Sequence, residues 1–232
     1  MRLLERCEDG KIRLVNFDND GDIPQYAILS HRWGRDEVLL QDIIRGTAST
    51  KDGYRKIEFC LDQASRDGLR FCWVDTCCID KTNAVELQES INRMFRWYHH
   101  AERCYVYLAD VPSTSFHRSD WFKRGWTLQE LIAPHSVEFF SREGWRLGDK
   151  RSREGDIHDI TGIPISALRG SSLSDFSVSE RKSWMDERET TRPEDKAYSL
   201  LGIFNVCITL LYGEGSKMAF KRLLEKVDPQ PS

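Results

Sequence analysis

The 232-residue sequence predicts an α/β fold, with a parallel sheet flanked by helices and a helical C-terminal elaboration. The first observation is that strand-like and helix-like patterns alternate along the first 140 residues, as in parallel sheets that are covered by helices. The second is that this alternation stops after residue 141. The third is the composition, because 40% hydrophobic residues and seven Trp suffice for a sizeable core and argue against disorder.

The α/β core is predicted from four short apolar runs and three amphipathic segments between them. Apolar runs bounded by polar or turn residues are typical of buried strands. Helices are predicted where apolar residues share one helical face, as Tyr54, Ile57 and Leu61 do. Asn83 and Glu86 resemble a capping box, which indicates a helix start. We expect strands at Tyr26–Ser30, Leu69–Asp75, Cys104–Ala109 and Val137–Phe140, and helices at Tyr54–Ala64, Leu87–Tyr98 and Trp121–Ala133.

The second part of the chain predicts helices without further strands. The charged, Gly-bearing stretch Gly144–Gly155 is interpreted as a surface loop. A short helix opens at Ser177–Glu180, Asp195–Leu211 is expected to be helical or mixed, and a last helix spans Met218–Val227. We therefore expect an α/β core over residues 1–140, a mostly helical part over 141–228, and the start of a linker at 229–232.

Composition also narrows the classes of partner. With 34 Lys and Arg against 37 Asp and Glu, the net charge of −3 argues against a nucleic-acid partner. The N-terminus has no apolar core of a secretory signal, and the longest apolar stretch, Leu200–Tyr212, is too short to span a membrane. Seven cysteines are an odd number that suits reduced thiols, so we expect a cytoplasmic protein without a membrane association.

Two polar clusters follow predicted strands: Ser30-His31-Arg32-Trp33 and Asp75-Thr76-Cys77-Cys78. Ligands of parallel sheets bind beyond the carboxyl ends of the strands, so both clusters are candidate binding segments. His31 and Arg32 suit an anion or a phosphate, but they are also ordinary for an exposed loop. Asp75 is either a functional acid or a turn and helix-cap residue.

The segment 124–134 contains a carboxylate next to an indole. Trp126 and Glu130 are four residues apart and share a helix face, while Leu128 and Ile132 point to the opposite side. Such an acid is either desolvated and reactive or a solvated residue above a half-buried Trp. The pattern alone favours the solvated residue, because isolated acids on helices mostly lie at the surface.

Several common sites are not supported by the sequence. Neither G-x-G-x-x-G nor a Walker A motif follows the first strand, which argues against a Rossmann dehydrogenase or a P-loop NTPase. The chain has no C-x-x-C pair, so no metal is expected. A Cys nucleophile with His31 has no support in the spacing, and Arg192, Glu194 and Asp195 are ordinary for helix capping.

Seven motifs in order resemble the fungal HET domain, a family named for heterokaryon incompatibility. They cover most of the chain: YAILSHRWG (26–34), WVDTCCIDK (73–81), ELQESINRMFRWY (86–98), CYVYLADV (104–111), RGWTLQELIAP (124–134), EDKAYSLLGIF (194–204) and LYGEG (211–215). The resemblance implies that residues 1–228 form a single HET domain. It also implies a longer parent protein, in which such domains precede NACHT and WD-repeat receptor parts.

HET domains are in turn distantly similar to TIR domains, which implies a flavodoxin-like fold and specific site residues. Glu130, in the W-x-x-x-E pattern with Trp126, corresponds to the catalytic acid of TIR domains that cleave NAD. Gly125 stands where many TIR domains have a polar or basic residue, and His31 has no fixed counterpart. The substrate-binding residues expected from the resemblance and the strand ends are Ser30, His31, Arg32, Trp33, Asp75, Trp126 and Asp195.

The resemblance implies a cell-death effector of fungal innate immunity that hydrolyses NAD when it self-associates. NAD is then a substrate, and no further cofactor is expected. A first alternative is a non-enzymatic module that triggers cell death by homotypic assembly. A second is a regulator that binds NAD-derived nucleotides without cleaving them. An acid at position 130 together with polar strand ends favours the enzyme, whereas an assembly module needs neither.

Overall fold

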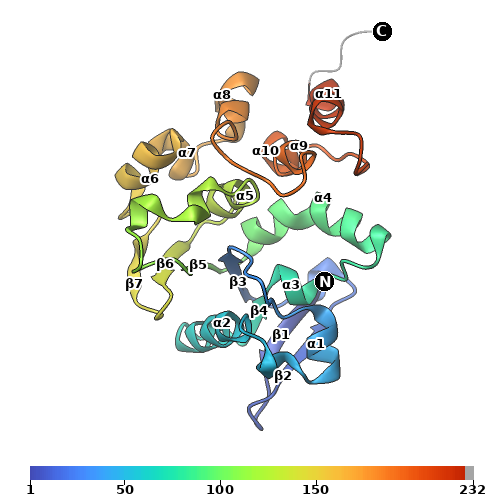
Figure 1. Ribbon diagram of the computed structural model, residues 1–232, viewed down its shortest axis with the longest axis vertical. Helices are drawn as coiled ribbons and strands as arrows, with labels where there is room; N and C mark the ends of the chain where they lie inside the picture. The colour runs from blue at the N-terminus through green and yellow to red at the C-terminus, as the bar shows by residue number, and fades with distance from the viewer. Residues whose placement is uncertain (228–232) are drawn as a thin grey trace.

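The computed structural model describes residues 1–227, which form a seven-stranded mixed sheet covered by helices on both faces (Figure 1). The strand order is β2-β1-β4-β3-β5-β6-β7. The strands are β1 (Arg2–Arg6), β2 (Ile12–Asn16), β3 (Tyr26–His31), β4 (Phe71–Trp73), β5 (Arg103–Leu108), β6 (Val137–Ser141) and β7 (Arg146–Asp149).

The centre of the sheet confirms the predicted α/β fold. The strands β4, β3, β5 and β6 are parallel neighbours and correspond to the four predicted strands. In chain order this arrangement is second, first, third and fourth, which is the order at the start of a flavodoxin-like sheet. The order reverses between β3 and β5, so a crevice for a ligand is expected beyond the carboxyl end of β3.

The two edges of the sheet are antiparallel and were not predicted. The hairpin β1–β2 pairs with β4, and β7 pairs with β6 inside the segment that the sequence indicated as a loop. The loop interpretation of 144–155 is therefore wrong. Both edges have weak apolar patterns: β7 has no fully buried residue, and the buried Glu5 of β1 is paired with Arg13 and Arg70.

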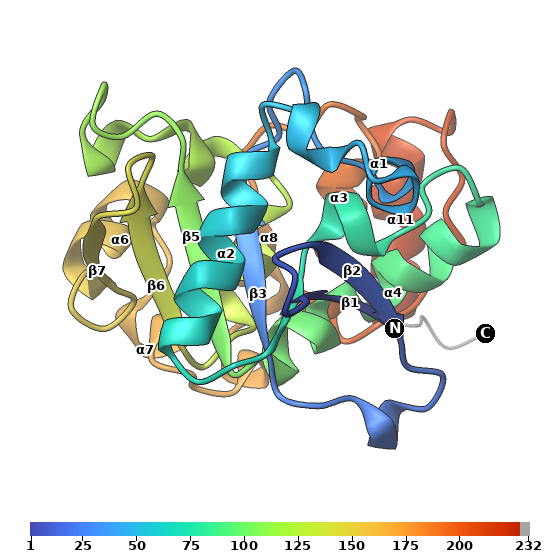
Figure 2. The same ribbon diagram turned by 90° about the horizontal axis from the view of Figure 1, so that it is seen from below.

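Helices form layers above and below the sheet (Figures 1 and 2). One face is covered by α2, the other by α4 and α5, and the C-terminal helices pack outside α4 and α5. The helices of the core are α1 (Leu40–Arg45), α2 (Tyr54–Arg66), α3 (Asp75–Cys78), α4 (Ala84–His100) and α5 (Thr127–Ile132). Those of the C-terminal part are α6 (Glu154–Thr161), α7 (Ile165–Leu168), α8 (Val178–Ser183), α9 (Asp195–Tyr198), α10 (Leu201–Phe204) and α11 (Ser216–Val227).

The helix predicted at Trp121–Ala133 is divided in two. A 3-10 turn at Asp120–Lys123 precedes α5, because the N–H of Gly125 bonds to the carbonyl of Glu189 instead of continuing the helix. Similarly, the second predicted strand ends at Trp73, and Asp75 begins α3. Asn83 caps α4 as expected, but Glu86 does not complete the expected capping box, because its carboxylate accepts from the N–H of Asp80 and from Arg2.

The C-terminal elaboration is helical as predicted, but its helices are short. Asp195–Leu211 contains two single turns, α9 and α10, and the second ends at Asn205 in the left-handed conformation. Ser177 and Glu180 form a complete capping box at α8. The predicted linker at 229–232 lies outside the described residues. Within residues 1–227, no helix combines the length and the hydropathy that crossing a membrane requires.

We expect Gly202→Ala to lower the free energy of unfolding by about 1–3 kcal/mol through overpacking. The new Cβ would lie 2.0 Å from the Cβ of Phe95, because α10 packs closely on α4. Urea denaturation measures the change. The control is Gly155→Ala, where the new Cβ meets nothing within 4 Å and Ala is the better helix former. Equal stability of Gly202→Ala and the unmodified chain would contradict this packing.

Candidate active site

A pocket of about 400 Å³ opens at the carboxyl ends of β3 and β4. Its walls come from these strand ends, α4, α5 and the C-terminal segments near 191–195 and 212. Six of the eight site residues expected from the sequence line it: His31, Trp33, Asp75, Trp126, Glu130 and Asp195. The pocket therefore lies where the reversal of strand order places the crevice.

Glu130 lies in the wall of the pocket and is only 8% exposed. Its carboxylate accepts a hydrogen bond from the hydroxyl of Ser30, which is fully buried behind the pocket at the end of β3. The Ser30 hydroxyl in turn accepts a hydrogen bond of 2.8 Å from the indole N–H of Trp121. This chain of donors fixes the Glu130 side chain from the side of the sheet.

The prediction of a solvated Glu130 is wrong. All six residues of α5 are buried, because the sheet covers one side of this helix and the C-terminal part covers the other. Burial raises the pKa of Glu130 to about 8. The hydrogen bond from Ser30 opposes this rise, and the nearby charge of Asp75 adds to it. Glu130 is thus a desolvated acid that titrates near neutral pH.

Asp75 is the second carboxylate of the pocket and differs in its surroundings. It accepts hydrogen bonds of 3.0 Å from the indole N–H of Trp33 and 3.0 Å from the ammonium of Lys81. Lys81 also lies 3.5 Å from the centre of the Trp33 ring. Burial disfavours the charged form, but Lys81 and then His31 hold the pKa of Asp75 below its ordinary value.

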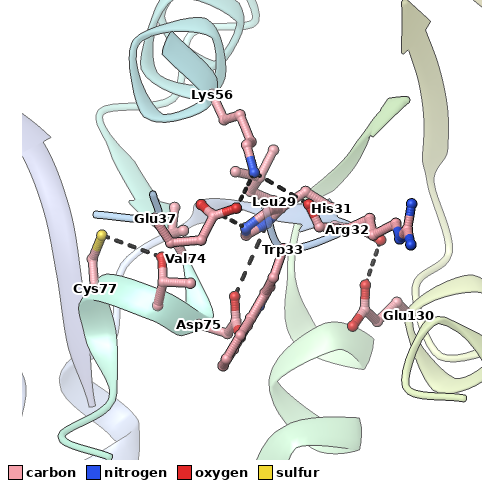
Figure 3. Close-up of polar contacts among 12 residues, drawn as sticks. Leu29, His31, Arg32, Trp33, Glu37, Lys56, Val74, Asp75, Cys77 and Glu130 are labelled. Carbon is pink, nitrogen blue, oxygen red and sulfur yellow. Dashed lines mark hydrogen bonds and ion pairs between the residues drawn. The ribbon is translucent and has the colours of Figure 1, made fainter. Parts of the chain in front are cut away.

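His31 lies between two acids at the end of β3 (Figure 3). Its Nε2 is 3.5 Å from Glu37, and its Nδ1 is 4.0 Å from Asp75 and has no hydrogen-bond partner among the described residues. Glu37 also pairs with Lys56, whose ammonium donates to the carbonyl of Arg32. Burial opposes ionisation of Glu37, yet His31, the N–H of Gly34 and Lys56 lower its pKa to about 2.

The outer wall comes from the C-terminal part. Asp195 accepts a hydrogen bond of 3.0 Å from the hydroxyl of Tyr212, and the Arg192 guanidinium lies 4.0 Å from the centre of the Tyr212 ring. Burial raises the pKa of Asp195, which Tyr212 and then Trp126 partly oppose by hydrogen bonding. The motif residues 194–204 and 211–215 thus contribute directly to the pocket.

These two C-terminal motifs are held together by hydrogen bonds. A carboxylate oxygen of Glu194 accepts 2.9 Å bonds from the N–H groups of both Gly213 and Gly215. The hydroxyl of Tyr198 donates to Glu214 over 2.8 Å. These hydrogen bonds fix Tyr212 over α9. Glu194 therefore has a structural role and is not only a helix cap.

Of the eight expected site residues, Arg32 alone lies neither in the wall of the pocket nor directly behind it. Its guanidinium is 2.9 Å from Asp120 at the surface, because the chain turns outward after His31. Gly125, the departure from the TIR pattern, also has a structural reason. A Cβ at this position would lie 2.4 Å from the methyl group of Thr190, so a side chain does not fit there.

Some pocket residues were missed by the sequence analysis: Lys81, Tyr98, Arg124, Arg192 and Tyr212. Each is inside or beside a quoted motif, but nothing in the local pattern separates these side chains from structural ones. Tyr98 is the clearest case, since its place in an apolar helix stripe predicts a core residue. Within the described residues, no group of three or more His, Cys, Asp or Glu is arranged to hold a metal ion.

Comparison with known proteins identifies the family. The model of "Heterokaryon incompatibility protein (HET)" matches residues 26–118, which include Ser30, His31, Trp33 and Asp75. This chain carries a HET domain. It is 58% identical over 241 residues to "Vegetative incompatibility protein HET-E-1" of Podospora anserina.

That similarity extends beyond the family model. It covers 98% of the chain, so the segments that hold Glu130 and Asp195 are included in a span of this identity. The chain spans only 18% of the length of this relative. No solved structure matches the chain.

We expect Glu130→Gln to become increasingly more stable than the wild-type HET domain as the pH rises from 5 to 8. The ordinary pKa of 4.5 applies to the unfolded chain, whereas burial raises it to about 8 in the folded one. Folding therefore requires a proton in this window, and the wild type loses about 1.4 kcal/mol of stability for each pH unit. Glutamine has no such dependence.

Urea denaturation at pH 5, 6.5 and 8 measures this difference. The control is Glu89→Gln, which changes an exposed glutamate of α4. Its stability should follow that of the wild type at every pH. A constant difference between Glu130→Gln and the wild type would show that Glu130 has an ordinary pKa in the folded domain.

Proposed function

We propose that this HET domain hydrolyses the bond between nicotinamide and ribose in NAD. The observation that carries the proposal is the desolvated Glu130, held by Ser30 in the wall of a pocket with a second carboxylate, Asp75. When Glu130 is ionised, its carboxylate favours a positively charged ligand ring in the pocket. The pocket volume of about 400 Å³ is within the range of small-molecule sites, which suits a nicotinamide riboside group.

The proposed reaction needs a carboxylate but no acid for the leaving group. As the C–N bond breaks, nicotinamide leaves with the bonding electron pair and becomes neutral, so it requires no proton. Positive charge develops on the ribose, and the Glu130 carboxylate stabilises it at close range in a water-poor site. Water then adds to the ribose carbon and releases one proton, giving ADP-ribose.

The other residues of the pocket have positioning roles in this proposal. Trp33 and Trp126 offer ring faces for the nicotinamide, and the apolar wall of α4 contributes Leu87, Ile91 and Met94. His31 lines the pocket beside Asp75, and its buried Nδ1 has no hydrogen-bond partner among residues 1–227. Ser30 holds Glu130, and Asp195 with Tyr212 closes the outer side.

The relative is a vegetative incompatibility protein, and we extend that role to this chain. In the proposal, the HET domain is a cytoplasmic, TIR-like cell-death effector of fungal innate immunity that kills by consuming NAD. It is the N-terminal part of a longer protein with NACHT and WD-repeat receptor parts, and self-association switches it on. A non-enzymatic assembly module that triggers cell death is the alternative that the experiments must separate.

We expect Glu130→Gln to reduce nicotinamide release by at least about 100-fold, since the charge that stabilises the transition state is lost. Release from NAD is measured by HPLC with purified domain, fused to an oligomerising tag and at high concentration. Glu89→Gln should retain wild-type activity, because this glutamate is exposed on α4 and outside the pocket.

The same variants separate the enzyme from the assembly module. Loss of cell killing together with loss of turnover in a stable Glu130→Gln domain supports the enzyme. If wild-type domain shows no turnover under forced assembly while cells still die, the assembly module replaces the present proposal.

The rate constant kcat/KM should rise with pH up to about 8 and then level off. This constant reports the free enzyme, in which burial raises the pKa of Glu130 to about 8 and leaves it mostly protonated at lower pH. Initial rates from pH 6 to 9.5 test this. Ser30→Ala removes a hydrogen bond that lowers the pKa of Glu130, so its midpoint should move upward. A flat profile would exclude Glu130 as the required carboxylate.

A further inference from the structure

A second groove of about 450 Å³ lies beside the pocket. One side is formed by Arg32, Asp120, Lys123 and Arg124, and the other by residues 189–191. Arg124 and Thr191 line both the groove and the pocket, so the two cavities are neighbours across these residues. The groove also contains Arg32, an expected binding residue that does not line the pocket.

The groove carries an excess of positive charge. One oxygen of Asp120 pairs with Arg32 at 2.9 Å, and the other pairs with Lys123 at 3.0 Å. A single carboxylate therefore balances two cations. The guanidinium of Arg124 has no ion-pair partner within residues 1–227, and Glu189 is the other acid of the lining. Three cations against two acids favour an anionic ligand.

The two sides of the groove are fixed to each other through the backbone. The N–H of Gly125 donates to the carbonyl of Glu189 over 2.8 Å, and the N–H of Glu189 donates to the carbonyl of Lys123 over 2.6 Å. A Cβ added at Gly125 would lie 2.4 Å from the methyl group of Thr190, so the two sides of the groove are in close contact there. The backbone that carries Lys123 and Arg124 is therefore fixed before a ligand binds, which reduces the entropy cost of binding.

The two cavities differ in their balance of charge. The pocket has the acids Asp75, Glu130 and Asp195 beside the cations Lys81, Arg124 and Arg192, whereas the cations outnumber the acids in the groove. In the proposed reaction the ring end of the substrate lies against Glu130 in the pocket, and the phosphates beyond it reach the neighbouring groove. We propose that the groove binds the pyrophosphate of a dinucleotide through Arg32, Lys123 and Arg124, while the ring end occupies the pocket. This inference rests on the proposed function, because it assigns the remaining half of the same substrate.

The test uses ADP-ribose and nicotinamide as separate probes of the two cavities. Binding to the purified chain is measured by calorimetry for ADP-ribose and by ligand-observed NMR for nicotinamide. Combined Arg32→Gln and Lys123→Gln substitutions should weaken ADP-ribose binding by about tenfold or more, because charge-assisted phosphate contacts are lost. Nicotinamide binding should remain unchanged, since neither residue lines the pocket.

The opposite change should have the opposite effect. Asp120→Asn removes the carboxylate that competes with phosphate, and ADP-ribose should bind about threefold more tightly. A residue that only stabilised the fold would not give this reversal. The matched control is Lys11→Gln, in the exposed turn of the β1–β2 hairpin, which should change neither affinity.

The outcomes distinguish failure of the proposed pyrophosphate site from failure of the proposed hydrolysis. Equal ADP-ribose affinity in the wild type, the combined variant and Asp120→Asn overturns the groove, even where nicotinamide release is observed. The absence of ADP-ribose binding to the wild type also overturns it. If the two variants change the ADP-ribose affinity as expected but no nicotinamide is ever released, the groove is a nucleotide site and the proposed hydrolysis fails.

Discussion

The hydrogen bond between Ser30 and Glu130 joins two segments that are 100 residues apart and determines the organisation of the site. It connects the end of β3, at the reversal of strand order, to the helix that follows β5. Both partners are buried, and the indole of Trp121 supports the serine from behind. A carboxyl group is costly to bury without partners, so this bond is the condition under which α5 can present an acid to the pocket.

The C-terminal part is as necessary to the site as the sheet. It covers α5 on the side away from the sheet, which removes water from Glu130, and it supplies Asp195 and Tyr212 to the outer wall. Neither effect would arise in an isolated four-stranded core. The different states of the two pocket carboxylates follow from their partners: Asp75 has an ammonium at 3.0 Å, whereas Glu130 accepts from the neutral hydroxyl of Ser30. One pocket thereby holds an ionised acid and an acid that titrates near neutral pH.

Periodicity and apolar runs were sufficient to predict the central strands and α2 and α4, because buried segments have a strong apolar signal. The antiparallel edges were missed because β7 has no fully buried residue and Glu5 of β1 is buried by ion pairing, which no local pattern shows. Among the expected site residues, those next to strand ends lie in or directly behind the pocket, except Arg32. The burial of Glu130 was not predictable from α5 alone, since its cover includes α7, which begins only at Ile165.

The hydrogen bonds from Gly213 and Gly215 to Glu194 also bear on the order in which the domain forms during translation. Translation proceeds from the N-terminus, so the sheet and α5 leave the ribosome well before these residues do. Until Gly215 has emerged, Tyr212 has no fixed position, and the outer wall of the pocket is missing. In the order of translation, the outer wall of the pocket is therefore completed after the sheet and α5, and chains that stop before residue 215 lack this wall.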